Sequence, residues 1–291
     1  MIVKVRAYSK LNLFLDITGR LPSGRHSLNI ATQSVDVYDD ITVDAILSHD
    51  FSCRIECNNP DIPCDERNIV YKAAKAFCTA SDINARISIT IEKNVPVMGG
   101  MGGSSVDGAG TLVALNEIFK NRLSKQELYD IGDSIGADVP ICMKGGTQYS
   151  TENGKMETAD CLADCVFVCV YPNFTLSTAL AYSKYDEFPT EISPYYAEFI
   201  KSIKNGSLSE CCKYISNVFT GIYRDDRINN IKNDLLNCGA STAEMTGSGS
   251  VVFGVFSAEA DAEKAVTKLN EKYPCCFIAR PVNCGVSVLF S

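Results

Sequence analysis

Apolar and polar residues alternate through about the first 60 positions of the chain. This period of two is typical of β-strands that bury one face, and the many valines, isoleucines and threonines strengthen the pattern. Turn-forming residues at 21–26 separate the first such segment from the second. The strand-like segments are residues 3–17, 28–39, 41–47 and 51–57. We therefore expect the chain to begin with an antiparallel sheet.

Apolar residues at helical spacing follow this strand-rich region. The strand pattern returns over residues 86–97, and we expect that strand to end at Pro96. A glycine-rich loop comes next, before two more helical stretches. Ser124 is expected to cap the last of these, because Glu127 stands three residues later, as in a capping box. The predicted helices are residues 68–81, 104–119 and 124–136.

The second half of the chain ends in the order strand, turn, strand, helix, strand, which is typical of a split βαβ unit. Its predicted elements are strands near 145–151 and 164–172, helices between 194 and 238, a strand–turn–strand unit over 241–256, a helix over 259–273 and a strand over 275–282. The chain has 291 residues and a domain usually takes about 100–200, so we expect two domains, 1–150 and 151–291. Because the sequence has neither an internal repeat nor a low-complexity linker, the two should pack directly together.

The charge balance argues against a nucleic-acid partner. Lysine and arginine are scattered along a chain with a formal net charge of −8, and no basic run could follow a phosphate backbone. The first residues alternate and include Lys4, Arg6 and Lys10, unlike a signal peptide or a membrane-spanning stretch. We therefore expect a cytosolic (cytoplasmic) protein with no nucleic-acid and no membrane partner.

Fourteen cysteines are spread along the chain, and in a cytosolic protein we expect them to stay reduced. Cys161, Cys165 and Cys169 recur every four residues, which on a helix would place three thiols on one face. Residues 165–172 are better interpreted as a buried strand, because they are rich in β-branched and aromatic residues and end at Pro172. The paired cysteines elsewhere lack the spacing and the histidines of a zinc site, so we expect no thiol-bound metal.

Residues 96–116 carry the strongest chemical signal: a strand ends at a proline, four glycines fill a short loop, and a serine pair begins a helix. Glycines can take positive φ and let the backbone approach a triphosphate, while the positive end of the helix dipole faces the anion. The serine hydroxyls can contact the phosphates or a Mg²⁺ ion, for which Ser105 is the candidate ligand. A flexible turn before an ordinary helix N-cap is the alternative. The predicted ATP-binding residues of this loop are Pro96, Gly99, Gly100, Gly102, Gly103, Ser104 and Ser105.

The loop is similar to the phosphate-binding motif of the GHMP kinases, and three more segments resemble the same family. They are residues 9–28, 135–147 and 245–256, in the family's order and approximate spacing. The resemblance implies an α+β fold of two lobes, with an N-terminal lobe like the second domain of ribosomal protein S5 and a ferredoxin-like C-terminal lobe. It also implies an ATP-dependent small-molecule kinase that uses Mg²⁺, with its active site in the cleft between the lobes.

Asp138 stands just before Val139 and Pro140. Pro140 biases Val139 towards an extended conformation, which would end any helix before the acid and hold its carboxylate in a loop. By resemblance to the family, Asp138 is the catalytic base that accepts the proton of the substrate hydroxyl, and Lys10 is the lysine that pairs with it. Without the resemblance, these two are an ordinary turn residue and a surface lysine.

The resemblance also implies a small-molecule substrate with a cytidyl group. His26 matches the histidine that the family uses on the cytosine, and Tyr182 matches a position where the family often has a stacking aromatic. Asn68 and Asn116 match positions near the adenine of ATP, although each is equally an ordinary cap or helix-surface residue. The predicted substrate-binding residues are Asn12, His26, Tyr182, Gly247 and Ser248.

Three residues depart from the family's pattern. Ser104 replaces the last glycine of the loop, Val106 replaces a second serine, and Arg25 stands where tyrosine is usual. The planar guanidinium of Arg25 could stack on a cytosine in place of the aromatic ring. The departures leave open another GHMP kinase, acting on homoserine, mevalonate or a sugar, and a non-catalytic ligand sensor. An RNA-binding role is opposed by the acidic charge, and both a monomer and a homodimer fit the sequence.

Overall fold

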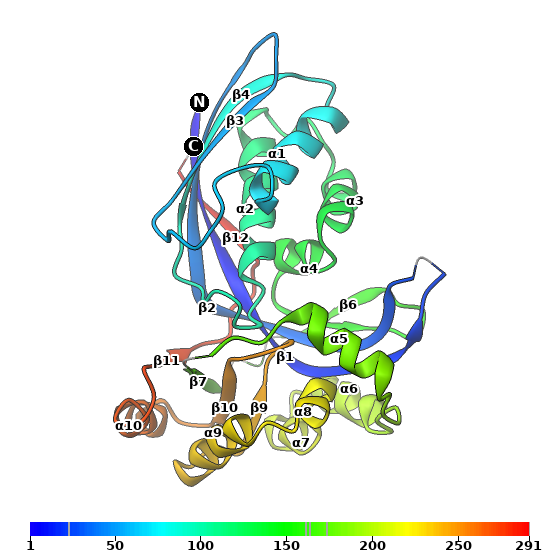
Figure 1. The fold of residues 1–291 in the computed structure, drawn as a ribbon, viewed down its shortest axis with the longest axis vertical. Coiled ribbons are helices and arrows are strands. Elements are labelled where there is room, and N and C mark those ends of the chain that lie inside the picture. Colours follow the sequence, from blue (N-terminus) through cyan, green and yellow to red (C-terminus); the bar gives the residue numbers. More distant parts are fainter. Residues whose placement is uncertain (23, 161, 163, 173, 291) are drawn as a thin grey trace.

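The computed structural model describes residues 1–22, 24–160, 162, 164–172 and 174–290. Two sheets form its framework, and the chain crosses from the first to the second and back (Figure 1). Strands β1 (Ile2–Arg20) and β2 (His26–Leu47) pair antiparallel along nearly their whole length. The predicted pair of opening strands with a turn between them is therefore confirmed.

The first sheet has the strand order β12-β1-β2-β4-β3, with β5 beside β2, β6 beside β5 and β8 beside β1. Its other strands are β3 (Ser52–Cys57), β4 (Ala85–Glu92), β5 (Thr147–Ser150), β6 (Met156–Ala159), β8 (Ser216–Asn217) and β12 (Val286–Phe290). The expectation of an antiparallel sheet is wrong for β3, which lies parallel to β4 because a helix connects the two. The predicted end of β4 at Pro96 is also wrong, because the N–H groups of Asn94 and Val95 donate to the Asp39 carboxylate instead of to a neighbouring strand.

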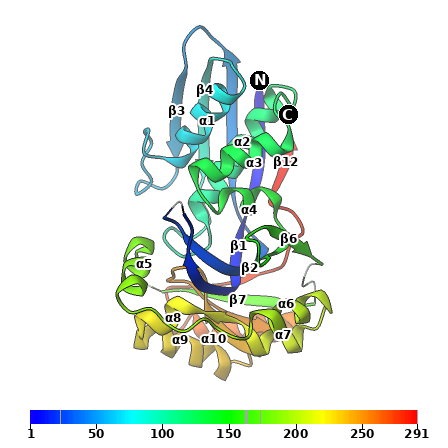
Figure 2. The same cartoon turned by 90° about the vertical axis from the view of Figure 1, so that its right-hand side faces the viewer.

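Four helices cover one face of the first sheet (Figures 1 and 2). They are α1 (Ile69–Ala80), α2 (Gly103–Ile118), α3 (Lys125–Ile135) and α4 (Val139–Lys144). The capping box at the start of α3 is confirmed, with Ser124 and Glu127 each bonding the other's backbone. A Cβ on Gly110 would lie 2.5 Å from Cδ1 of Ile41, so glycine lets α2 approach β2 closely. The extended conformation expected for Val139 is wrong: Pro140 lies in the first turn of α4, where its missing N–H breaks no hydrogen bond.

The second sheet has the order β11-β7-β10-β9 with every neighbouring pair antiparallel, which is the ferredoxin-like arrangement that was expected. Its strands are β7 (Val166–Tyr171), β9 (Thr242–Met245), β10 (Val252–Phe256) and β11 (Cys275–Ala279). The helices of this half are α5 (Thr178–Glu187), α6 (Tyr196–Lys204), α7 (Leu208–Tyr214), α8 (Val218–Tyr223), α9 (Asp226–Asn237) and α10 (Glu259–Leu269). Cys169 is buried in β7, so the strand interpretation is confirmed there, whereas Cys161 lies outside the described residues.

Three strands that lie beyond residue 150 return to the first sheet. They are β6, which pairs with β5, and β8 and β12, which both pair with β1. The domain boundary at residue 150 stays a prediction, but the region 151–291 does not form one continuous lobe. Within the described ranges, no helix is both long and apolar enough to cross a membrane.

Candidate active site

A cavity of about 830 Å³ opens where the glycine-rich loop before α2 meets the turn between β9 and β10. Parts of β1, β2, α1, α5 and α8 and the residues just before α4 complete its walls. Most of the predicted site residues line it, namely Lys10, Asn12, Asn68, Pro96, Gly99, Gly100, Gly102, Gly103, Ser104, Ser105, Asp138, Tyr182, Gly247 and Ser248. Two predicted residues, His26 and Asn116, are not among its lining residues.

The backbone of the glycine-rich loop brings the N-terminus of α2 to the cavity. Gly100 and Gly102 each have a φ of +78°, and Met98 has a φ of +55°. Positive φ is not found at Gly99 or at Gly103, which already lies in the first turn of α2. Gly102 is the N-cap of α2 and has no side chain to bond the first N–H groups, which suit an anion.

Close backbone contacts fix this loop to the β9–β10 turn. The N–H of Val251 donates to the carbonyl of Gly99 at 3.1 Å, and a Cβ on Gly100 would lie 2.1 Å from the carbonyl oxygen of Thr246. Thr246 also accepts a hydrogen bond, through its hydroxyl, from the N–H of Asn12 at 2.9 Å. The loop, β1 and the turn therefore meet at the floor of the cavity.

Lys10 and Asp138 form an ion pair in this cavity. The Lys10 side chain is almost fully buried, and its Nζ lies 3.5 Å from Oδ2 of Asp138, whose side chain is 36% exposed. Lys10 also donates to the carbonyl of Gly100 at 3.2 Å and to the side-chain oxygen of Asn12. The exposed oxygen of a paired carboxylate can accept a proton from a bound hydroxyl, while the ammonium faces the loop that would hold an anion.

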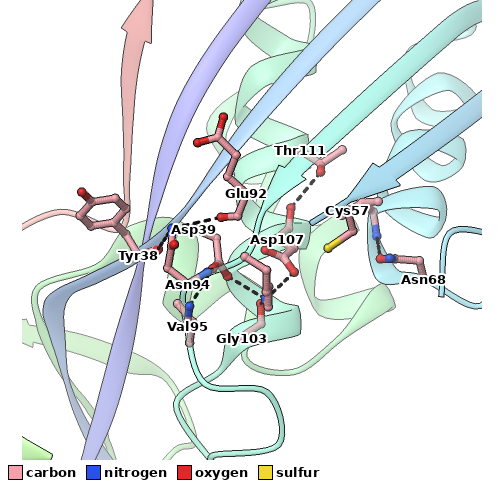
Figure 3. A network of polar contacts seen from close by, with 12 residues as sticks. Tyr38, Asp39, Cys57, Asn68, Glu92, Asn94, Val95, Gly103, Asp107 and Thr111 are labelled. Carbon is pink, nitrogen blue, oxygen red and sulfur yellow. Dashed lines mark hydrogen bonds and ion pairs between the residues drawn. The ribbon is translucent and has the colours of Figure 1, made fainter. Parts of the chain in front are cut away.

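A buried charge cluster below the loop was missed by sequence reasoning. Nζ of Lys93 donates to Asp39 at 2.7 Å, to Asp107 at 2.6 Å and to the carbonyl of Gly103 at 2.7 Å. Figure 3 shows Asp39, on β2, and Asp107, on α2, pointing towards each other beside Gly103. One signal was available: Asp39 occupies an inward position in the alternation of β2, between Val37 and Ile41.

Burial dominates the electrostatics of this cluster. It raises the pKa of Asp107 to about 8, although Lys93 acts in the opposite direction. Burial alone would lower the pKa of Lys93, but Asp107 and Asp39 outweigh it and raise that pKa. Oδ1 of Asp107 has no hydrogen-bond partner within the described part of the chain. Burial therefore favours the protonated form of the Asp107 carboxyl.

His26 and Tyr182 contact each other at the end of the β1–β2 hairpin. Their rings stack with centroids 4.7 Å apart. Tyr182 also packs edge-on against Phe219, and both of these rings line the cavity. Arg25 does not lie over these rings, because its guanidinium pairs with Asp133 of α3 at 3.1 Å. The structure thus brings the two residues predicted to bind the cytosine ring together. Of these two, Tyr182 lines the cavity and His26 does not.

The two asparagines predicted near the adenine lie in different surroundings. Asn68 lines the cavity and caps α1 by accepting from the N–H of Val70. Asn116 is buried near the C-terminus of α2, and its amide group exchanges two hydrogen bonds with the backbone of Leu123. Its side chain therefore holds the α2–α3 connection, and its nucleotide contact stays a prediction.

Comparison with protein families gives two matches. Residues 68–146 match the model described as the GHMP kinases N terminal domain, and residues 199–275 match the model described as GHMP kinases C terminal. Together these two regions include the glycine-rich loop, Asp138 and the β9–β10 turn.

Curated relatives and solved structures agree with these matches. The chain is 38% identical to the 4-diphosphocytidyl-2-C-methyl-D-erythritol kinase of Clostridium tetani, over 96% of this chain and 100% of the relative. It is 36% identical to the protein of the same name from Clostridium botulinum (strain Eklund 17B), with the same coverage. Among solved structures, a 4-(cytidine 5'-diphospho)-2C-methyl-D-erythritol kinase superposes with a TM-score of 0.76 at 21% identity, covering 95% of this chain and 98% of the other. The homoserine kinase of Cytophaga hutchinsonii gives 0.80 at 16% identity, with coverages of 99% and 97%. At such identities the structures show the shared fold only.

Proposed function

The chain belongs to the GHMP kinases, and from that premise we propose that it transfers the γ-phosphoryl group of ATP to the 2-hydroxyl of 4-diphosphocytidyl-2-C-methyl-D-erythritol. This reaction is a step in the non-mevalonate synthesis of isoprenoid precursors. The names of the full-length relatives support the substrate, and the Lys10–Asp138 pair in the cavity supports the chemistry. That pair is the observation that carries the proposal.

In this proposal Asp138 accepts the proton of the acceptor hydroxyl as the phosphoryl group arrives. Lys10 pairs with the Asp138 carboxylate and offsets negative charge that develops on the transferring group. Because Lys10 also donates a hydrogen bond to the carbonyl of Gly100, it fixes the position of the glycine-rich loop relative to Asp138. Positioning and charge stabilisation account for most of the acceleration in a phosphoryl transfer, which suits a site whose groups are fixed by the fold.

The nucleotide would lie along the loop with its phosphates at the N-terminus of α2. Gly100 and Gly102 take positive φ, and the Cβ that each lacks would meet the β9–β10 turn or the Lys10 side chain, so glycine lets the loop pack against both. Ser105 is the proposed Mg²⁺ contact, because its half-buried hydroxyl lies in the first turn of α2 and lines the cavity. Mg²⁺ commonly binds through one or two protein oxygens together with substrate phosphates, and it would neutralise charge on those phosphates.

The same proposal covers partners and location. The negative charge and scattered basic residues support a small-molecule kinase that binds no nucleic acid. We place it in the cytosol as a monomer or a homodimer.

A panel of acceptor alcohols tests the substrate. ADP release is measured with the cytidyl substrate, homoserine and mevalonate, and only the first is expected to be phosphorylated. Robust turnover of an acceptor that lacks a cytidyl group would overturn the substrate assignment and leave the kinase assignment in place.

A pair of variants tests the proposed base. Asp138→Asn should lower kcat by about 10²- to 10⁴-fold with little change in the KM for ATP, because the carboxylate acts on the acceptor and not on the nucleotide. Asp130→Asn, on the exposed surface of α3, is the matched control and should behave like the wild type. Near-normal turnover by Asp138→Asn would remove Asp138 as the base.

A further inference from the structure

The imidazole of His26 is held from several sides by helix α5. Tyr182 stacks on one face, Tyr185 meets the ring edge-on with centroids 6.0 Å apart, and Nε2 lies 2.8 Å from Oδ1 of Asp186. Both views place the end of the β1–β2 hairpin beside α5 (Figures 1 and 2). His26 therefore has a fixed orientation even though it lies at the start of a strand, next to a turn.

Asp186 can act only as a hydrogen-bond acceptor in this contact. Its second oxygen, Oδ2, accepts from Nη2 of Arg20 at 2.5 Å. The hydrogen bond with His26, followed by that from Arg20, holds the pKa of Asp186 below its usual range. An ionised carboxylate has no proton to give, so Nε2 of His26 must carry the hydrogen that joins them.

The other ring nitrogen of His26 is then free to bind a ligand. A neutral imidazole with hydrogen on Nε2 has an acceptor at Nδ1, and no partner of Nδ1 is found among the residues that the structure describes. Leu28 and Ile30, which share the face of His26 on β2, both line the cavity. His26 thus continues the strand face that lines the cavity and stacks on Tyr182, which lines the cavity itself.

We propose that Asp186 is a positioning residue that fixes the Nε2–H tautomer of His26, so that Nδ1 selects a pyrimidine with an exocyclic amino group over one with a carbonyl there. The proposal rests on the cytidyl substrate of the proposed function and adds the residue that sets its specificity. The amino group of cytosine donates a hydrogen bond to Nδ1. Uracil presents an oxygen at the same place, and two acceptors facing each other repel.

The tautomer can be measured without any activity assay. The chain contains two histidines, His26 and the exposed His49, so long-range ¹H–¹⁵N spectra in alkaline buffer resolve His26 against an internal reference. We expect only the Nε2–H form of His26 in the wild type and in Glu187→Gln, a control that removes an exposed charge from the same helix. Asp186→Leu should show the Nδ1–H form as well. A wild-type His26 protonated at Nδ1 would overturn the proposal.

Specificity provides the second test. The ratio of kcat/KM for the cytidyl substrate to that for its uridyl analogue should fall at least about tenfold in Asp186→Leu, mainly through KM for the cytidyl substrate, and should be unchanged in Glu187→Gln. An unchanged ratio in Asp186→Leu would overturn the role of Asp186 while leaving the proposed function intact. If the wild type phosphorylates neither compound, the proposed function fails, and this inference fails with it whatever the spectra show.

Discussion

Replacing Lys93 with methionine tests how much the buried charge cluster stabilises the fold. Methionine has a similar length, but it loses the three hydrogen bonds to Asp39, Asp107 and the carbonyl of Gly103. Both carboxylates are nearly fully buried, so the change leaves them facing each other without a cation. Removing one partner of a buried ion pair usually costs about 3–5 kcal/mol. Protonation of Asp107 offsets part of that cost, so we expect the low end of the range.

Urea unfolding followed by circular dichroism measures this free energy directly, and the melting temperature should fall by on the order of 10 °C. Lys4→Met is the matched control, because Lys4 pairs with Asp40 and Glu92 on the same sheet but is partly exposed. Its cost should stay below about 1 kcal/mol. Adding Asp107→Asn to Lys93→Met should recover part of the loss, since the amide cannot ionise beside the Asp39 carboxylate and can donate a hydrogen bond to it. A loss below 1 kcal/mol for Lys93→Met would refute this account of the cluster.

Three further predictions follow from the same region. The pKa of Asp107 is about 8 in the folded chain and about 3.9 in an unfolded one, so the folded state holds the extra proton between these values and the free energy of unfolding should fall as pH rises from about 4 to 8. Asp107→Asn should flatten this slope in urea midpoints taken across that range, and an equal slope in both proteins would contradict the assignment. Gly100→Ala should lower the melting temperature more than Gly154→Ala, because both positions have positive φ but only the first would clash with the Thr246 carbonyl. Equal decreases in melting temperature would mean that the loop moves to relieve the clash. Val106→Ser should cost about 2 kcal/mol or more in unfolding free energy, because Val106 is fully buried, and an unchanged midpoint would count against this.

Local patterns predicted the elements well where one face of each element is buried. The alternation of β1 and β2 and the helical spacing of α1 follow directly from burial, and the capping box fixed the start of α3 at Ser124. The prediction of an extended Val139 was wrong because Pro140 has two opposing effects. It disfavours helical dihedrals at the preceding residue, but it also fits the first turn of a helix, and in this chain α4 begins at Val139. The parallel position of β3 depends on a crossover through α1, which periodicity does not encode.

The parts of the site that belong to recognisable sequence motifs could be predicted from the sequence. The glycine-rich loop, Lys10 and Asp138 do line one cavity, and their roles stay predictions until they are measured. The Lys93 cluster escaped notice because its members come from three separate segments, and the inward position of Asp39 does not by itself indicate which residues it pairs with. Val106 was interpreted as a missing hydroxyl of the phosphate loop, but the helix turns that position into the core.

The pairing of β12 with β1 has a consequence for biosynthesis. Ribosomes make β12 long after β1, so the edge of β1 that pairs with β12 has no partner in this sheet while the residues between the two strands are made. An unpaired strand edge is a template on which other chains can add. A polypeptide that stalls before Val286 leaves Lys4–Ala7 of that edge uncovered, which makes translational arrest between β1 and β12 a route to aggregation and a reason for chaperones to remain bound until β12 is made.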